Sequence, residues 1–164
     1  MESWTWTPGR LGPFRHDTPF SREAIQPHLP DYSLSECAGE PGNPGGRILA
    51  ATPPGATGAT LMFLGHADTP CLIGLRVREP GRIANAWSVG SRFGETLLRA
   101  EDCFASAEIP GRQGDIFCRQ AGEADGPIYW FRTAMDDLGG IVPDEETVRQ
   151  SVLYELGCVL FDPQ

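Results

Sequence analysis

Apolar and polar positions follow a helical spacing between residues 91 and 101. Phe93, Leu97 and Leu98 fall close to one face of a helix, whereas Glu95 and Arg99 are left to face water. This pattern predicts a short amphipathic helix over residues 92–101.

Two further short helices are predicted. A helical pattern covers residues 21–28 and stops where Pro27 and Pro30 remove backbone donors and disfavour helical conformation in the preceding residue. Another starts at Asp144, because this carboxylate and the next suit the positive end of a helix, and it runs through Gln150.

The remaining apolar runs are short and separated by Gly/Pro-rich turns, which is typical of strands. In the first half they cover residues 32–36, 47–51, 60–64 and 71–77, and in the second half residues 104–109, 115–119, 128–131 and 156–161. The 20 Gly and 15 Pro of the chain also favour many short strands over long helices.

The two halves carry these elements in the same order. Met62–Phe63 correspond to Trp130–Phe131, and Ile25 corresponds to Leu97. We therefore predict an α+β fold built as a tandem repeat of one helix plus about four antiparallel strands, with one sheet and the helices on one face. Half a sheet and one helix bury too little apolar area alone, so residues 1–164 should form a single domain with repeats at about 18–79 and 88–162. Residues 1–19 are predicted to be an irregular arm that packs on this body.

Charge narrows the possible partners. The net charge is −9, and all 13 cationic residues are Arg without a basic cluster. Binding to nucleic acid or to anionic lipid through charge is therefore not expected.

The five cysteines favour an oxidising compartment without forming a dense disulfide scaffold. If the strands after residue 103 pair as a hairpin, Cys103 and Cys118 come close enough to form a disulfide. Two buried thiols or two metal ligands are the alternatives. Cys71 and Cys158 would face each other if the last strands of the two halves met at the centre of the sheet, leaving Cys37 unpaired.

A family resemblance rests on motifs of the second half: Val89–Phe93 opening a helix, Cys103 and Cys118, Ile128–Phe131, and Val142–Asp144 before a closing strand. This order resembles a bacterial family of sigma-E-regulated outer-membrane lipoproteins of unknown function, mainly over residues 83–162 and more loosely over 18–77. The resemblance implies a duplicated α+β fold, a periplasmic location and an N-terminal lipid anchor. No lipobox cysteine stands near residue 1, so membrane attachment is expected only through an anchor outside these residues.

The predicted architecture is also similar to that of the secreted β-lactamase inhibitory proteins, whose tandem helix-plus-strand units each hold a disulfide. Those inhibitors bind through a concave sheet face. This similarity implies an alternative function, a secreted or periplasmic inhibitor of an enzyme or toxin.

A catalytic interpretation depends on His66, Asp136 and Asp137, which would serve a hydrolase, with Cys71 as a further nucleophile candidate. Their spacing is not diagnostic of catalysis. Turn formation explains these residues more simply, so a hydrolase is the second alternative.

The main prediction is a non-enzymatic periplasmic envelope protein, in the outer membrane if anchored, that binds an envelope protein or cell-wall component. No cofactor or metal is expected. Trp87 and Tyr129 are the predicted binding residues, as exposed aromatic anchors on the open sheet face. Trp130 could form a stacking platform with its neighbours, but we assign it to the core.

Overall fold

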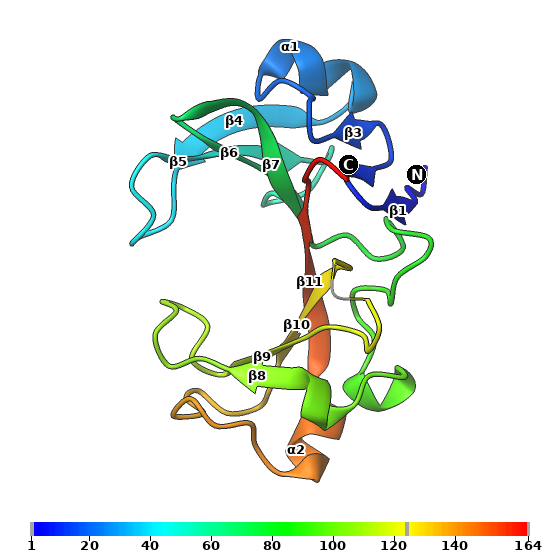
Figure 1. Ribbon diagram of the computed structural model, residues 1–164, viewed down its shortest axis with the longest axis vertical. Helices are drawn as coiled ribbons and strands as arrows, with labels where there is room; N and C mark the ends of the chain where they lie inside the picture. The colour runs from blue at the N-terminus through cyan, green and yellow to red at the C-terminus, as the bar shows by residue number, and fades with distance from the viewer. Residues whose placement is uncertain (1, 124, 164) are drawn as a thin grey trace.

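The computed structural model describes residues 2–123 and 125–163 and contains one large antiparallel sheet (Figure 1). The α+β class and the antiparallel sheet are thus confirmed. The sheet has eight strands, in the spatial order β4 (Ser33–Ala38), β5 (Gly46–Thr52), β6 (Leu61–His66), β7 (Thr69–Val77), β11 (Val152–Val159), β10 (Ile128–Arg132), β9 (Asp115–Cys118) and β8 (Cys103–Ala105).

The first and second halves of the chain meet at the pairing of β7 with β11. In this pair Leu75 lies opposite Cys158, and Gly157 lies opposite Arg76. Since every neighbouring pair in the sheet is antiparallel, the sheet continues across the two halves without a break. Figure 1 shows it curving around β11, with β4–β7 on one side and β8–β10 on the other.

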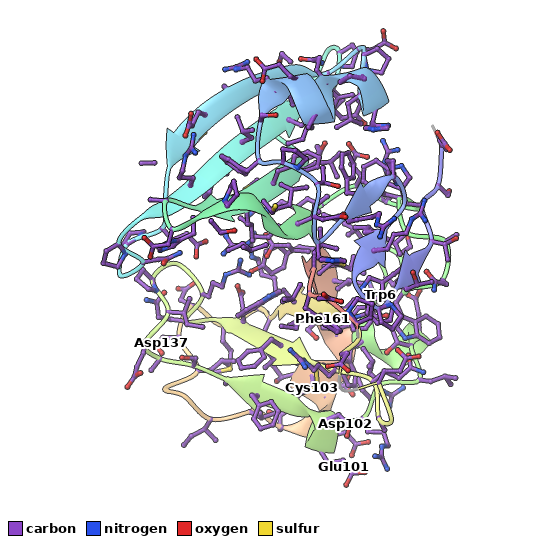
Figure 2. The ribbon with its side chains drawn as sticks, turned by 45° about the horizontal axis from the view of Figure 1, so that its top comes forward. Trp6, Glu101, Asp102, Cys103, Asp137 and Phe161 are labelled. Atoms are coloured by element: carbon purple, nitrogen blue, oxygen red, sulfur yellow. A yellow bond between two sulfur atoms is a disulfide. The ribbon has the colours of Figure 1, made fainter. Side chains whose placement is uncertain are left out.

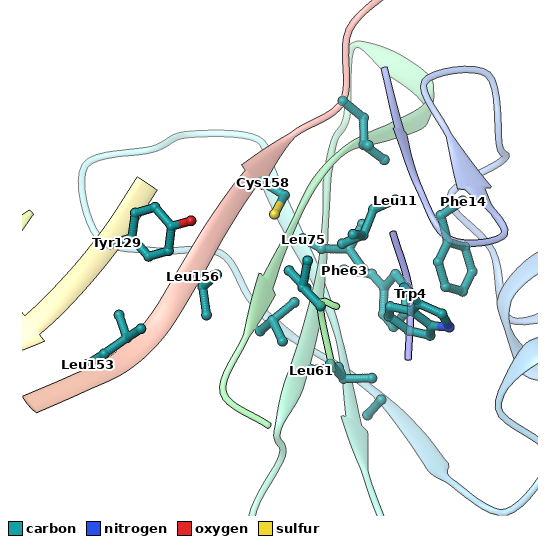
Figure 3. Packing of buried hydrophobic residues seen from close by; sticks show 14 of the residues in the cluster. Trp4, Leu11, Phe14, Leu61, Phe63, Leu75, Tyr129, Leu153, Leu156 and Cys158 are labelled. Carbon is teal, nitrogen blue, oxygen red and sulfur yellow. The ribbon is translucent and has the colours of Figure 1, made fainter. Parts of the chain in front are cut away.

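One face of this sheet carries the core. Strand residues alternate between faces, so Phe63 on β6, Leu75 on β7 and Leu156 on β11 all point to the same side and are almost fully buried (Figure 3). Tyr129 and Phe131 on β10 continue the same buried layer. Side chains at the intervening positions point to the other face.

The N-terminal arm covers the core face of the first half. It forms a small three-stranded sheet from β1 (Trp6–Thr7), β2 (Arg10–Leu11) and β3 (Phe14–Arg15), where an irregular arm is predicted. The Phe14 ring packs edge-on against Phe63 with the ring centres 4.9 Å apart. The arm therefore belongs to the body, as predicted.

The helices are few and short. Helix α1 (Arg22–Ile25) continues into a 3₁₀ turn at Gln26–His28, and the Ser21 side chain accepts a hydrogen bond from the Ala24 amide at its start. Helix α2 (Glu145–Gln150) starts after Asp144, whose carboxylate accepts from the Thr147 amide at 2.8 Å. Both agree with the predicted positions. None of the helices in the described residues is long and apolar enough to cross a membrane.

The predicted helix over residues 92–101 is wrong. This segment forms two separate 3₁₀ turns, at Phe93–Glu95 and Ala100–Asp102. Leu97, assigned to the buried helix face, is 78% exposed, while Phe93 packs on Phe131.

Backbone pairing with β11 explains this difference. The Phe93 amide donates to the Ser151 carbonyl, and the Leu153 amide donates to the Ser91 carbonyl, so the start of the segment is held as an extended bridge. Thr96 then adopts extended backbone, and its hydroxyl donates to the Phe93 carbonyl, which ends the first turn. Tertiary pairing overrides a weak local helical preference here.

Candidate binding face of the sheet

Three aromatic side chains form a row on the face of the sheet opposite the core. Phe104 on β8 pairs with Phe117 on β9, which pairs with Trp130 on β10. Their ring centres are 5.6 Å and 4.9 Å apart along the row. Phe104 is 59% exposed, so this aromatic row begins in solvent at the sheet edge and leads inward. Apolar rings that share water-facing surface in this way are typical of binding sites.

Arg112, from the loop between β8 and β9, closes the inner end of the aromatic row. Its guanidinium carbon lies 3.9 Å from the centre of the Trp130 ring, a cation–π contact. The same guanidinium donates to the Tyr154 hydroxyl at 2.9 Å and to the Glu155 carboxylate at 2.6 Å. Stacking and hydrogen bonds together hold the β8–β9 loop over the sheet face.

Glu155 is a fully buried carboxylate on this face. Its second oxygen accepts from the Arg78 guanidinium at 2.9 Å, so both oxygens bind an arginine. Pairing charges in this way offsets the cost of removing them from water. The Trp130–Glu155 register places both groups side by side across β10 and β11.

A β-bulge brings Tyr154 to the same site. Trp130 pairs with Glu155 but the next residue, Phe131, pairs with Leu153, so Tyr154 is the extra residue. Its hydroxyl donates to Asp115, and burial together with this hydrogen bond raises the pKa of Tyr154 well above its usual range. Tyr154 is therefore a neutral hydrogen-bonding partner at ordinary pH.

A groove crosses the centre of this face, with a volume of about 360 Å³. We call it the central groove. Its rims are the β4–β5 loop, where Glu40 forms an ion pair with Arg76 of β7, and the β8–β9 loop with Arg112. Figure 1 shows both loops extending to the same side of the sheet. The residues that line the groove are mostly apolar: Leu64, Ile73, Gly74, Leu75, Ile109, Ile128, Trp130, Gly157, Cys158 and Val159, with Glu40, Arg76 and Arg112.

Of the two predicted binding residues, Tyr129 does not lie on the open face. Its side chain is only 1% exposed and belongs to the core layer (Figure 3), because it alternates with Trp130 along β10. Burial raises the pKa of Tyr129 to about 12, against the opposing effect of a hydrogen bond from the Trp87 backbone. Both predictions are therefore wrong: Tyr129, predicted to be exposed, is buried in the core, and Trp130, assigned to the core, lies on the open face.

Trp87 lies in the connection after β7 and is half-buried against the core. With Tyr129 it lines a smaller cavity of about 270 Å³, separate from the central groove. The structure brings the two predicted residues together, but in the connection and the core and not on the sheet face.

Two of the three residues of the hydrolase hypothesis, His66 and Asp137, hold turns through their side chains. His66 Nδ1 accepts from the Asp68 amide, and its Nε2 lies 2.9 Å from the Pro44 carbonyl oxygen. Asp137 accepts from the Gly139 amide at 2.8 Å, at the margin of the molecule (Figure 2). In the part of the chain that the structure describes, no hydrogen bond or ion pair joins His66 to Asp136 or Asp137.

The predicted disulfide is confirmed. Cys103 on β8 and Cys118 on β9 are bonded and directly opposite each other in the sheet. The expectation that Cys71 faces Cys158 is wrong, because Cys158 pairs with Leu75 and Cys71 lies at the other end of β7, against Pro19. The free cysteines are thus Cys37, Cys71 and Cys158. The described residues hold no cluster of three His, Cys, Asp or Glu side chains suited to a metal ion.

Sequence reasoning missed the aromatic row, although a signal for it was present. A disulfide between two strand neighbours sets their register, and this register places Phe104 opposite Phe117. Period-two alternation would then have placed Trp130 beside Phe117, away from Tyr129 and Phe131. Arg112, Glu155 and Glu40 had no such signal, because loop conformation and the β-bulge bring them to the face.

Fold and site together define an α+β protein with one continuous antiparallel sheet. One face of this sheet packs against the hydrophobic core, and the other face carries a groove with mostly apolar walls. The uncharacterized protein YfeY from Escherichia coli has a crystal structure similar to this one, with a TM-score of 0.70 at 14% sequence identity, covering 96% of this chain and 99% of that chain. At this identity the similarity shows the fold alone. No protein-family model and no curated protein matches the sequence.

Proposed function

We propose that this is a non-enzymatic periplasmic envelope protein that binds another envelope protein or a cell-wall component through the open sheet face. The observation that carries the proposal is the aromatic row beside the central groove, with Phe104 exposed to solvent. Aromatic side chains, including phenylalanine, and arginine are enriched at protein interfaces. The disulfide supports an oxidising compartment.

The resemblance to sigma-E-regulated lipoproteins adds to this proposal a lipid anchor and an outer-membrane location. We also propose that the chain consists of two repeats, residues 18–79 and 88–162. The strand order supports this, since β4 to β7 and β8 to β11 follow one another inward from opposite edges and meet at the centre. In the second repeat, 3₁₀ turns stand where the first repeat has α1.

An inhibitor of an enzyme or toxin is the second candidate. The curved sheet with aromatic side chains on its open face favours it, because a convex loop of a partner fits such a surface. Both candidates use the same face, so one experiment tests both and identifies the partner.

Site-specific photo-crosslinking provides this test. A photo-reactive phenylalanine analogue at position 104 should form a discrete adduct with one envelope partner in cells that produce the protein. The same analogue at Leu97 is the matched control, because Leu97 is also exposed and apolar but lies in the connection between the two 3₁₀ turns. Strong adducts at position 97 with none at 104 would contradict the proposal.

Affinity for the identified partner should then depend on the aromatic row. We expect Phe104→Ala to weaken binding by upwards of about 2 kcal/mol, roughly thirtyfold, because it removes an exposed anchor. Trp87→Ala tests the predicted binding residue Trp87, which lies outside the aromatic row. If His66→Ala, Asp136→Ala or Asp137→Ala abolished binding of the partner while Phe104→Ala left it unchanged, a hydrolase would replace the binding proposal.

A further inference from the structure

Two glycines, Gly74 and Gly157, line the central groove. Gly74 on β7 and Gly157 on β11 both belong to the open face, where Gly74 pairs with Val159 and Gly157 with Arg76. A Cβ atom added at Gly157 would meet only ordinary contacts, 3.8 Å from Ile128 and 3.9 Å from the Trp130 indole nitrogen. The space above Gly157 is thus open because the residue has no side chain.

The groove combines apolar walls with an excess of positive charge. Its walls are apolar side chains such as Leu64, Ile128 and Val159, and its volume of about 360 Å³ lies within the range of roughly 300–1,000 Å³ that is usual for small-molecule sites. Two guanidinium groups, Arg76 and Arg112, and one carboxylate, Glu40, line the groove, while the buried Glu155 carboxylate binds Arg78 and Arg112. The site therefore has one surplus positive charge in a chain whose net charge is −9.

The two carboxylates differ in how firmly they are held. Glu155 is fully buried and binds two arginines, so it is a fixed part of the site. Glu40 is 43% exposed, lies on the Gly/Pro-rich loop between β4 and β5, and forms an ion pair with one arginine, Arg76. Arg76 is itself largely covered, with 18% of its side chain exposed at the groove wall. Glu40 thus occupies a carboxylate position that another carboxylate can take over.

We propose that the central groove binds a single-chain amphiphilic carboxylate. The apolar chain lies over Gly157 and Gly74 beside Trp130, and the carboxylate binds Arg76 in place of Glu40. The surplus positive charge selects an anion, and the apolar walls select a chain over a short polar acid. This site goes beyond the proposed partner interface, and it can be tested on the purified protein without any partner.

Calorimetric titration of the purified protein with octanoate tests the proposal. Octanoate should bind saturably, whereas 1-octanol, which lacks the charge, and propionate, which lacks the chain, should bind at least about tenfold more weakly. Equal affinity for octanoate and octanol, or no binding of octanoate, would overturn the proposal. The crosslinking result at position 104 is independent of this outcome, so failure here leaves the partner proposal standing.

Substitutions in the groove, with one control outside it, test where octanoate binds. Gly157→Val should abolish octanoate binding by filling the groove, while Gly58→Val, at a position with no atom near the added carbon, should leave it unchanged. Glu40→Gln should tighten octanoate binding, because it removes the competing carboxylate. Arg76→Gln should reduce octanoate affinity to that of octanol. If Gly157→Val does not fold, Gly157→Ala and Glu40→Gln decide: unchanged affinity in both would rule out the groove.

Discussion

At the scale of single residues, the buried Glu155 carboxylate depends on the two arginines that bind it. It is fully buried, and the Arg112 side chain that binds it is only 11% exposed. A buried ion pair contributes little net stability over an apolar pair, but removal of one partner leaves an uncompensated charge. The charge network therefore shapes the open face more than it stabilises the fold.

Replacing Glu155 should destabilise the protein strongly. Glu155→Ala leaves Arg112 buried without its carboxylate, and we expect a loss of about 3 kcal/mol in the free energy of unfolding. The control is Glu36→Ala, which breaks the exposed pair with Arg47 and should cost about 0.2–1 kcal/mol. Urea unfolding followed by circular dichroism measures both. Equal losses of unfolding free energy in the two variants would contradict this, because they would mean that the Arg112 guanidinium becomes exposed to water when Glu155 is removed.

At the scale of elements, the short edge strand β8 depends on its disulfide. It has only three residues, Cys103–Ala105, and it carries the exposed end of the aromatic row. The bond to Cys118 ties it to β9 and limits the conformations of the unfolded chain. The disulfide thus links the stability of an element to the geometry of the candidate binding face.

Counting reactive thiols tests whether Cys103 and Cys118 are bonded. Denatured, unreduced protein should show three reactive thiols, because only Cys37, Cys71 and Cys158 are free. In the native protein near pH 8, exposed Cys37 should react quickly and Cys158 not at all, since burial raises the pKa of Cys158 to about 12.

Loss of the disulfide should also have an energetic effect. Replacing Cys103 and Cys118 together by Ser should lower the free energy of unfolding by about 3 kcal/mol for a loop of this length. Cys37→Ser is the control and should change it little, because Cys37 is exposed. Five reactive thiols in unreduced protein would contradict the bond itself.

At the scale of the whole molecule, contacts between distant segments join the two halves. The Arg78 guanidinium donates to the Glu155 carboxylate, and the central strands β7 and β11 pair over Leu75 and Cys158. Separating the halves would expose the apolar core face along both strands. Units as small as these halves bury a smaller fraction of their surface and are only marginally stable alone.

We therefore expect residues 1–164 to unfold in one cooperative transition. Tryptophan fluorescence reports on Trp4 and Trp6 in the N-terminal arm, on Trp87 in the connection and on Trp130 in the second half. Circular dichroism reports on the sheet as a whole. The urea midpoints from the two probes should coincide. Two separated transitions would show that each half folds as a domain of its own.

The sequence by itself determined the α+β class, most strand positions, and helices α1 and α2. These features depend on alternation, capping residues and turn composition, which act over a few neighbouring residues. The sequence indicated the Cys103–Cys118 bond as one of three alternatives, and the tertiary structure decided among them. Only the tertiary structure decided the conformation of residues 92–101. Backbone pairing of Ser91 and Phe93 with the start of β11 outweighs a weak helical preference there. The open face was decided in the same way. The N-terminal arm and Phe93 pack on one face of the sheet, and this decides that Tyr129 is the buried residue and Trp130 lies on the open face. The groove exists because two loops far apart in the sequence reach the central strands, where Glu40 binds Arg76 and Arg112 binds Glu155.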